Sequence, residues 1–270
     1  MAKKIRLIWG RLPKLHKDSL AVAFAVFAFM LSLVDILGNP LREVKWHFRL
    51  LAIVAFLVLI YIIVAVIKER NAQNGLSLTI NRNAVKIEVR DIKDGGIFKF
   101  HGWKLISFNE YFDTTVDDVI INHNSINGKF IDDYVEDIND LNTVLNNTPR
   151  KAHKLGTIVP YKNEYMCLSF SKFDTKNQAF FNGRGEYEQC LREMWAEIRR
   201  VYANKPVAIP LLGSSIPIFR NTTRPTKYEC LKCILCTLKS SNVYFDKAVT
   251  VIIDKESAQE INLYELKGAL

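Results

Sequence analysis

The chain has 270 residues, 49% of them hydrophobic and 24% charged, with 12 glycines and 8 prolines, which excludes a disordered, collagen-like or low-complexity protein. Its five cysteines are too few, and an odd number, for a disulfide scaffold. The net charge of +9 does not indicate a nucleic-acid partner, because residues 1–70 hold 11 lysines and arginines against 4 acidic residues, whereas the remaining 200 hold 26 against 24.

Two apolar stretches of membrane-spanning length lie in the first seventy residues. Ser19–Leu37 is apolar for 19 residues except for Asp35 and small hydroxyl side chains, and Leu50–Ile67 is apolar for 18 residues without a charge. As helices they would each cover about 27–29 Å, roughly the hydrocarbon thickness of a bilayer. A Gly-Asn-Pro sequence at 38–40 separates them. We therefore expect residues 1–70 to form a basic N-terminal segment and a two-helix transmembrane hairpin.

The basic residues around these stretches predict the orientation of the hairpin. Six lysines and arginines precede the first span, two directly follow the second, and three lie between the spans. Because cytoplasmic flanks carry the excess of positive charge, both termini are expected in the cytoplasm. A cleavable signal peptide is the alternative for the first stretch, but a second apolar stretch follows at once and small residues do not end the first.

Residues 71–270 alternate between strand-like and helix-like segments. The expected strands are 76–80, 84–89, 105–108, 165–170, 207–210 and 249–253, the first two joined as a hairpin across 81–83. Apolar residues at helical spacing predict helices over 130–147, 186–202 and 225–241. Strands that alternate with long helices imply crossover connections. The prediction is therefore an α/β domain with a mixed, largely parallel sheet flanked by helices.

Two loops directly follow expected strands and are candidate ligand sites, because ligands of such sheets bind beyond the carboxyl ends of the strands. The first is Asn109–Thr114, after strand 105–108, and the second is Leu211–Ile216, after strand 207–210. A Gly-Ser-Ser turn offers successive backbone N–H groups and hydroxyls to a phosphate. Small residues also make ordinary turns, so this pattern alone leaves both interpretations open.

Four short motifs occur in the order found in macro domains. They are Val89–Ile92, Phe108–Asn109, Asn127–Ile131 and Ala208–Ser215. The segments FNEYFDT, NSINGKFID, IPLLGSS and the closing INLYELK more closely resemble Thoeris anti-phage defence effectors, in the form with two N-terminal transmembrane helices and a macro domain. This resemblance covers the whole chain, and it implies a macro-like fold for residues 71–270 and a cytoplasmic, ligand-binding role for that domain.

The resemblance also implies a set of ligand-binding residues. They are Asp91, Ile92, Asn109, Glu110, Tyr111, Phe112, Asp113, Gly128, Gly213, Ser214, Ser215, Ile216 and Phe219. Asp91 and Ile92 correspond to positions that contact the adenine. Asn109 and Phe219 correspond to positions near the distal ribose. Gly128 and the loop 213–216 correspond to the backbone that approaches the diphosphate.

Two departures from the family pattern disfavour catalysis. Macro domains that remove ADP-ribose carry a second asparagine three positions after the first, where this chain has Phe112, and the glycine-rich stretch before the next helix is reduced to Asn127-Gly128. We therefore expect no catalytic residue and no enzyme activity. Glu110, Tyr111 and Asp113 are instead candidates to meet a cationic amino-acid group on the ligand.

The family implies a function for the whole chain. It would be an effector in the bacterial inner membrane that senses histidine-ADP-ribose, made from NAD by a companion TIR-domain enzyme. Binding would drive homo-oligomerisation, and the hairpins would disrupt the lipid bilayer to abort infection. The alternatives are a membrane-tethered ADP-ribosyl hydrolase and a non-enzymatic ADP-ribose-binding scaffold. No cofactor is expected besides the ligand.

A Cys-x-x-Cys-x-x-Cys pattern at Cys230, Cys233 and Cys236 raises the possibility of a metal or iron–sulfur site. These cysteines alternate with leucine and isoleucine in an expected helix, and no fourth ligand is obvious. Thiols that pack one face of the helix are the favoured interpretation, and no metal site is expected. Among the histidines, only His123 lies near the first loop.

Overall fold

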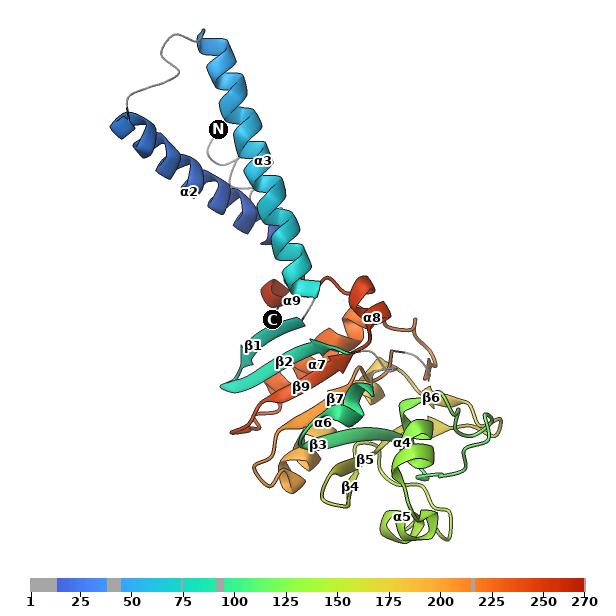
Figure 1. Cartoon of the computed structure of the whole chain (residues 1–270). Helices are drawn as coiled ribbons and strands as arrows, with labels where there is room; N and C mark the ends of the chain where they lie inside the picture. The colour runs from blue at the N-terminus through green and yellow to red at the C-terminus, as the bar shows by residue number, and fades with distance from the viewer. Residues whose placement is uncertain (1–13, 38–44, 74, 91–94, 215–216, 270) are drawn as a thin grey trace. The chain divides into compact units, whose positions relative to one another are not determined.

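The computed structural model describes residues 14–37, 45–73, 75–90, 95–214 and 217–269 (Figure 1). The chain divides into two compact units, one comprising residues 1–74 with Asn262–Ala269, and the other comprising Gly75–Ile261. We expected one boundary near residue 70 and a second domain that continued to the C-terminus. In the structure, the last helix instead groups with the N-terminal helices.

The described residues of the first unit form the helices α2 (Lys14–Leu37), α3 (Trp46–Gln73) and α9 (Leu263–Ala269). Helix α2 contacts α3, and both contact α9. His16 in the first turn of α2 lies 2.5 Å from the Tyr61 hydroxyl near the middle of α3. Ser19 and Ala23, one turn apart on α2, are both buried, and such small side chains allow close helix packing.

One helical segment among the described residues can cross a membrane by length and composition. It is Leu51–Lys68 in α3, with a mean hydropathy of 3.0 and no buried residue. This segment coincides with the second expected span. The first expected span, 19–37, lies within α2 and stays a prediction.

The second unit is built on a sheet of nine strands. They are β1 (Gly75–Ile80), β2 (Asn83–Val89), β3 (Trp103–Asn109), β4 (Ile158–Tyr161), β5 (Tyr165–Phe173), β6 (Ala179–Phe181), β7 (Val207–Pro210), β8 (Ile218–Phe219) and β9 (Val249–Ile253). The strand order is β1-β2-β9-β7-β3-β5-β6-β8, with β4 paired to β5. The central strands β2, β9, β7, β3 and β5 are parallel. Strand β1 pairs antiparallel with β2, both β4 and β6 pair antiparallel with β5, and β8 pairs parallel with β6. The mixed, largely parallel sheet predicted from the sequence is confirmed.

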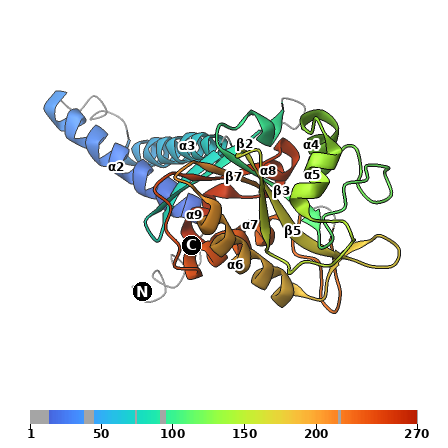
Figure 2. The same cartoon turned by 90° about the horizontal axis from the view of Figure 1, so that it is seen from below.

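Helices cover both faces of this sheet (Figure 2). They are η1 (Gly96–Lys99), α4 (Ile126–Tyr134), α5 (Ile138–Leu145), α6 (Arg184–Val201), α7 (Lys227–Ser240) and α8 (Lys255–Glu260). Helices α6 and α7 pack against each other on one face, and α4 packs on β3. The expected helices 186–202 and 225–241 agree with α6 and α7 to within two residues at each end.

The single helix expected over 130–147 is wrong. The structure has α4 and α5 there, because Val135 turns the backbone into an extended conformation after α4. Asp137 then starts α5 by accepting a hydrogen bond from the Asn139 N–H with its carboxylate. The apolar spacing continues through both helices, so periodicity alone could not locate this break.

Candidate functional site

A cleft of about 1350 Å³ lies at the carboxyl ends of the parallel strands. Its walls include Arg90 directly after β2, Asp254 after β9, Leu211 after β7 and Asn109 at the end of β3. This is the position at which parallel α/β sheets bind their ligands. Ligand pockets commonly measure about 300–1,000 Å³, so this cleft has room for a large ligand.

The second loop, directly after β7, is held in place by three hydrogen bonds. The Tyr187 hydroxyl on α6 donates to the Leu212 carbonyl (3.0 Å), the Ser214 hydroxyl donates to the Leu211 carbonyl (2.9 Å), and the Arg224 guanidinium donates to the Ser214 carbonyl (3.0 Å). Burial raises the pKa of Tyr187 well above its ordinary value, so this hydroxyl remains a donor at neutral pH.

The same loop presents unused backbone donors at the cleft. Gly213 and Ser214 both line the cleft, and within the described ranges their N–H groups have no protein acceptor. Gly213 has φ +82°, and a Cβ at this position would lie 2.9 Å from the Tyr187 ring. The loop can therefore present its N–H groups to an anion because a glycine permits this conformation. The predicted residues Ser215 and Ile216 lie outside the described residues.

The start of helix α4 also lines the cleft. Ser125 caps it by accepting a hydrogen bond from the Gly128 N–H (2.9 Å). Gly128 itself does not line the cleft, but its neighbours Asn127 and Lys129 do. A Cβ at Gly128 would lie 2.2 Å from the Asn122 carbonyl oxygen, so the glycine permits close packing of the preceding loop against the helix.

Asn127 is a candidate site residue that the sequence analysis did not select. Its side-chain oxygen is buried and has no hydrogen-bond partner among the residues that the structure describes. A buried acceptor without a donor is unfavourable, so a ligand hydroxyl or amide could satisfy it. The feature of the sequence that could have identified Asn127 is its position at the start of an expected helix, directly before a glycine.

Asn109 lines the cleft, yet its side-chain amide is used to shape the first loop. Its oxygen accepts hydrogen bonds from the N–H groups of Tyr111 (3.0 Å) and Asp113 (3.1 Å), and its nitrogen donates to the Asp113 carboxylate (2.8 Å). The loop folds back after β3 around this amide. Phe112, at φ +53°, is fully buried against the rings of Phe108 and His153 and does not itself line the cleft, although Phe108 does.

The other residues of the first loop contact the rest of the domain rather than the cleft. Asp113 accepts two hydrogen bonds from Arg150 (2.9 and 2.7 Å), whose guanidinium also lies 3.7 Å from the centre of the Tyr111 ring. The Glu110 carboxylate accepts a weak hydrogen bond from the Phe173 N–H (3.4 Å). We expected Asp113 and Tyr111 to contact a cationic group on the ligand. In the structure they contact Arg150 of the protein itself.

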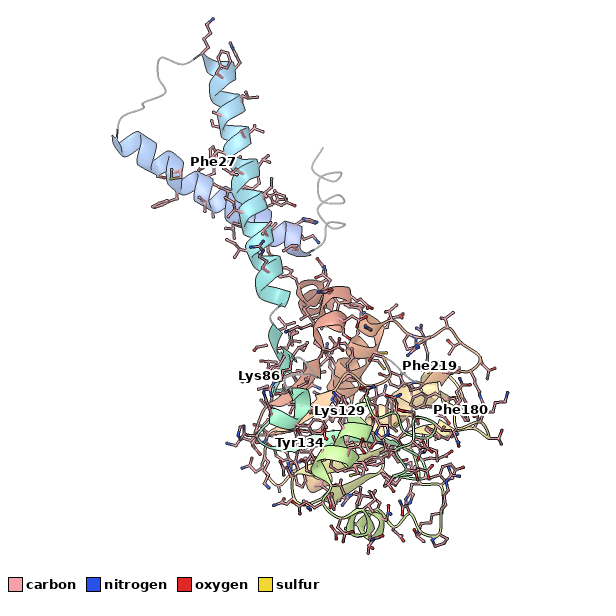
Figure 3. The ribbon with its side chains drawn as sticks, turned by 45° about the vertical axis from the view of Figure 1, so that its right-hand side comes forward. Phe27, Lys86, Lys129, Tyr134, Phe180 and Phe219 are labelled. Atoms are coloured by element: carbon pink, nitrogen blue, oxygen red, sulfur yellow. The ribbon has the colours of Figure 1, made fainter. Side chains whose placement is uncertain are left out.

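The structure does not bring Phe219 to the cleft. Its ring packs with Phe181 and Tyr187, each at a centroid distance of 5.5 Å, and it is 5% exposed. Figure 3 labels Phe219. Asp91 and Ile92, the predicted adenine-contacting residues, lie outside the described residues, although Arg90 directly before them lines the cleft. Of the predicted residues that are described, the cleft thus brings together Asn109, Gly213 and Ser214.

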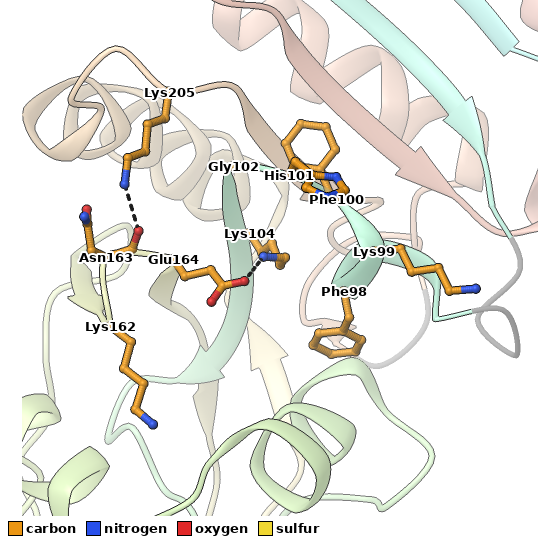
Figure 4. A pocket seen from close by; sticks show the side chains of 10 residues that line it. All are labelled: Phe98, Lys99, Phe100, His101, Gly102, Lys104, Lys162, Asn163, Glu164 and Lys205. Atoms are coloured by element: carbon orange, nitrogen blue, oxygen red, sulfur yellow. Dashed lines mark hydrogen bonds and ion pairs between the residues drawn. The ribbon is translucent and has the colours of Figure 1, made fainter.

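A second cavity, of about 810 Å³, lies at the amino end of β3 and is rich in lysine (Figure 4). Lys104 pairs with Glu164, Lys162 pairs with Glu136, and the Lys205 ammonium donates to the Asn163 carbonyl (3.1 Å). Two of the four lysines that line this cavity, Lys104 and Lys162, thus have a carboxylate partner within the domain.

No group of three His, Cys, Asp or Glu side chains able to hold a metal occurs among the residues placed by the structure. Cys230 is fully buried on α7, Cys233 is half-buried and Cys236 is exposed. Burial raises the pKa of Cys230 to about 11, so this thiol is protonated at neutral pH. His123 is exposed and lies 2.7 Å from the Asp132 carboxylate.

Comparison with known proteins assigns the family. The sequence profile described as "Thoeris protein ThsA, Macro domain" matches residues 91–254. The chain is 34% identical over 248 residues to the Thoeris protein ThsA of Bacillus amyloliquefaciens (strain Y2), a match that covers 83% of this chain and 80% of that protein.

Solved structures of a macrodomain from Oceanobacillus iheyensis are also similar to this chain. A point mutant of that macrodomain matches with a TM-score of 0.45 and 11% identity, over 72% of this chain and 90% of the macrodomain. A form with MES bound matches with a TM-score of 0.46 and 12% identity, over 73% and 98%. On the profile match and the 34% identity, the chain belongs to the ThsA macro-domain family of Thoeris proteins.

Proposed function

We propose that this protein is an anti-phage membrane effector whose macro domain binds histidine-ADP-ribose, a signal that a TIR-domain enzyme makes from NAD. The observation that carries the proposal is the cleft at the carboxyl ends of the parallel strands, where two backbone N–H groups of the loop after β7 have no acceptor among the described residues. Such donors at a large cleft are suited to a phosphate-bearing ligand. Membership of the Thoeris family supports the role in defence.

The charges that line the cleft support an anionic ligand. Lys129, Lys176 and Arg224 line it without an ion pair to a carboxylate among the described residues. By contrast, Arg90 pairs with Glu88. Asp118, Asp254 and Glu256 also line the cleft, but they are fewer than its lysines and arginines. Unpaired cations in a concave surface favour the binding of a diphosphate.

The first loop supports binding without turnover. The Asn109 amide oxygen already accepts two hydrogen bonds inside the loop, and Phe112 places a buried ring where hydrolytic macro domains carry a second asparagine. A phenylalanine ring offers no polar group to position a water molecule for hydrolysis. We therefore propose a sensor rather than a hydrolase.

The first unit supports the membrane part of the proposal. The Leu51–Lys68 segment supplies one span, and α2 would supply the second. The Glu265 carboxylate on α9 accepts a hydrogen bond from the Leu15 N–H (3.3 Å), and the Tyr264 hydroxyl donates to Asp18 (2.5 Å). These contacts hold the last helix beside the start of α2, as expected if both ends of the chain lie on the cytoplasmic side of the inner membrane.

Assembly of several copies completes the proposed mechanism. Two helices cannot enclose a conducting path, so disruption of the bilayer requires a homo-oligomer. A ligand that binds the assembled form more tightly than the monomer shifts the equilibrium by that difference in affinity, and by no more. Signal binding in the macro domain would in this way control the membrane helices.

The test uses the full-length protein in lipid nanodiscs, mixed with ADP-ribose or with histidine-ADP-ribose. Mass spectrometry would follow the ligand, both free and retained on the protein. We expect intact histidine-ADP-ribose to be retained, in preference to ADP-ribose. Release of free histidine would instead identify a hydrolase, and retention of neither ligand would refute the proposed signal.

A further inference from the structure

We propose that Arg224 is a diphosphate-binding side chain of the cleft. This inference rests on the proposed function, because it assumes that the ligand carries the diphosphate of ADP-ribose. Arg224 lies outside the motifs that carry the family resemblance, and it was not among the residues predicted from the sequence. It lines the cleft and is exposed to solvent.

The position of Arg224 places its charge beside the phosphate-binding loop. One guanidinium nitrogen donates to the Ser214 carbonyl (3.0 Å), directly next to the unused N–H groups of Gly213 and Ser214. A guanidinium has five N–H donors, and the described contacts use one of them. Gly213, Ser214 and Arg224 all line the same cleft, so the remaining guanidinium donors and the two backbone N–H groups belong to one binding site.

Neighbouring arginines differ from Arg224 in their partners. Arg184 pairs with Glu229 (3.3 Å), and Arg220 pairs with Asp174 (3.3 Å) while lying 3.5 Å from the centre of the Phe180 ring. Among the described residues, Arg224 contacts only a neutral carbonyl. Its positive charge is therefore available to an anion, and the charges of the other two arginines are already compensated.

The backbone around Arg224 is held in place before any ligand binds. The next residue, Pro225, is buried and restricts the backbone conformation of Arg224. Thr226 then caps α7 in a reciprocal arrangement with Glu229. Because the side chain starts from a fixed point, less conformational entropy is lost when it binds a phosphate.

The test compares Arg224→Gln with Arg220→Gln in the full-length protein. Both variants remove one positive charge from the same segment of the chain, but Arg220 does not line the cleft. Isothermal titration would measure the affinity for ADP-ribose and for adenosine, which lacks the diphosphate. We expect Arg224→Gln to weaken ADP-ribose binding by about 10- to 100-fold, as for loss of a charge-assisted hydrogen bond, and to leave adenosine binding unchanged. Arg220→Gln should change either affinity by less than about 3-fold.

Each outcome distinguishes this inference from the proposed function. If the wild-type protein binds ADP-ribose and both variants bind it equally well, Arg224 has no such role while the proposed function stands. If Arg224→Gln weakens adenosine as much as ADP-ribose, the residue acts only by holding the loop, and the inference is overturned. If the wild-type protein binds neither ADP-ribose nor histidine-ADP-ribose, the proposed function fails, and this inference, which rests on it, fails with it. Arg224→Lys, which keeps the charge, should restore part of the ADP-ribose affinity and controls for misfolding.

Discussion

Gly213 is the residue on which the shape of the second loop most depends. Its φ of +82° is unfavourable for other residues, and a Cβ would lie 2.9 Å from the Tyr187 ring. We expect Gly213→Ala to destabilise the second unit by about 1–3 kcal/mol and to weaken binding of ADP-ribose. Thermal unfolding of the full-length protein, followed by tryptophan fluorescence, would measure the first effect.

Gly185 provides a matched control for this substitution. It lies in α6, and a Cβ there would meet no atom within 4 Å. Alanine at a helical position is favoured over glycine, so Gly185→Ala should stabilise the domain by up to about 1 kcal/mol. Equal effects of the two substitutions would contradict the proposed role of the Gly213 backbone.

His153 makes the stability of the domain depend on pH. Burial, together with the nearby Lys151, lowers its pKa below the ordinary value of 6.5, and its Nε2 has no partner in the described part of the chain. The unfolded chain therefore takes up a proton more readily than the folded chain, so this residue decreases stability as the pH falls below about 6.5. His153→Phe should flatten the fall in unfolding temperature between pH 7 and pH 5.

His123 should act in the opposite direction. Its hydrogen bond with Asp132 raises its pKa, so the stability that it contributes is present below about pH 6.5 and is lost as the pH rises. His123→Ala should therefore steepen the fall in stability towards pH 5. If both histidine variants shift the pH profile in the same direction, the assignment of these two environments is wrong.

At the scale of elements, helix α9 near the C-terminus contacts the start of helix α2. Its Leu266 is fully buried, and Tyr264 donates a hydrogen bond to Asp18 on α2. Burial and the Asp18 hydrogen bond raise the pKa of Tyr264 to about 12, so the hydroxyl keeps its proton at neutral pH. We expect Tyr264→Phe to remove about 1 kcal/mol of local stability, which would speed hydrogen exchange of the α9 amides by roughly fivefold.

Tyr244→Phe is the control for this measurement. Tyr244 is 46% exposed and lies in the second unit, so the same change of side chain should leave α9 exchange unaltered. Unchanged exchange in Tyr264→Phe would show that packing of the apolar residues alone holds α9 in place.

At the scale of the whole molecule, the proposed function requires that α3 lie within the bilayer. Val58 is at the middle of the Leu51–Lys68 segment and is 51% exposed. An arginine at the centre of a span costs about 3 kcal/mol, so Val58→Arg should abolish ligand-triggered dye leakage from proteoliposomes. Binding of the ligand by the macro domain should persist.

Val144→Arg introduces the same charge at an exposed position of α5 in the second unit, where it should leave leakage intact. Persistent leakage in the Val58→Arg protein would exclude the proposed membrane mechanism. Loss of leakage in both variants would indicate a general effect of added positive charge.

Much of the fold follows from local patterns in the sequence. The turn at Asn81 and Arg82, with φ of 45° and 70°, joins β1 to β2 as predicted. The alternation of apolar strands and helices predicts the parallel centre of the sheet, because such segments can bury their apolar faces only in layers. The placement of the cleft at the carboxyl ends of the strands follows from that topology.

Only the tertiary structure decided how the individual polar groups are used. The sequence places Asn109 and Asp113 in a candidate loop, but Arg150, which occupies the Asp113 carboxylate, lies 37 residues further along the chain. Arg224 likewise meets Ser214 only through folding. The local spacing of apolar residues predicts which face of a helix or strand is buried. Which charges and hydrogen-bonding groups pair with each other depends instead on residues that are distant in sequence. For that reason the sequence determined the layers and the location of the cleft, and the tertiary structure decided which side chains remain available to a ligand.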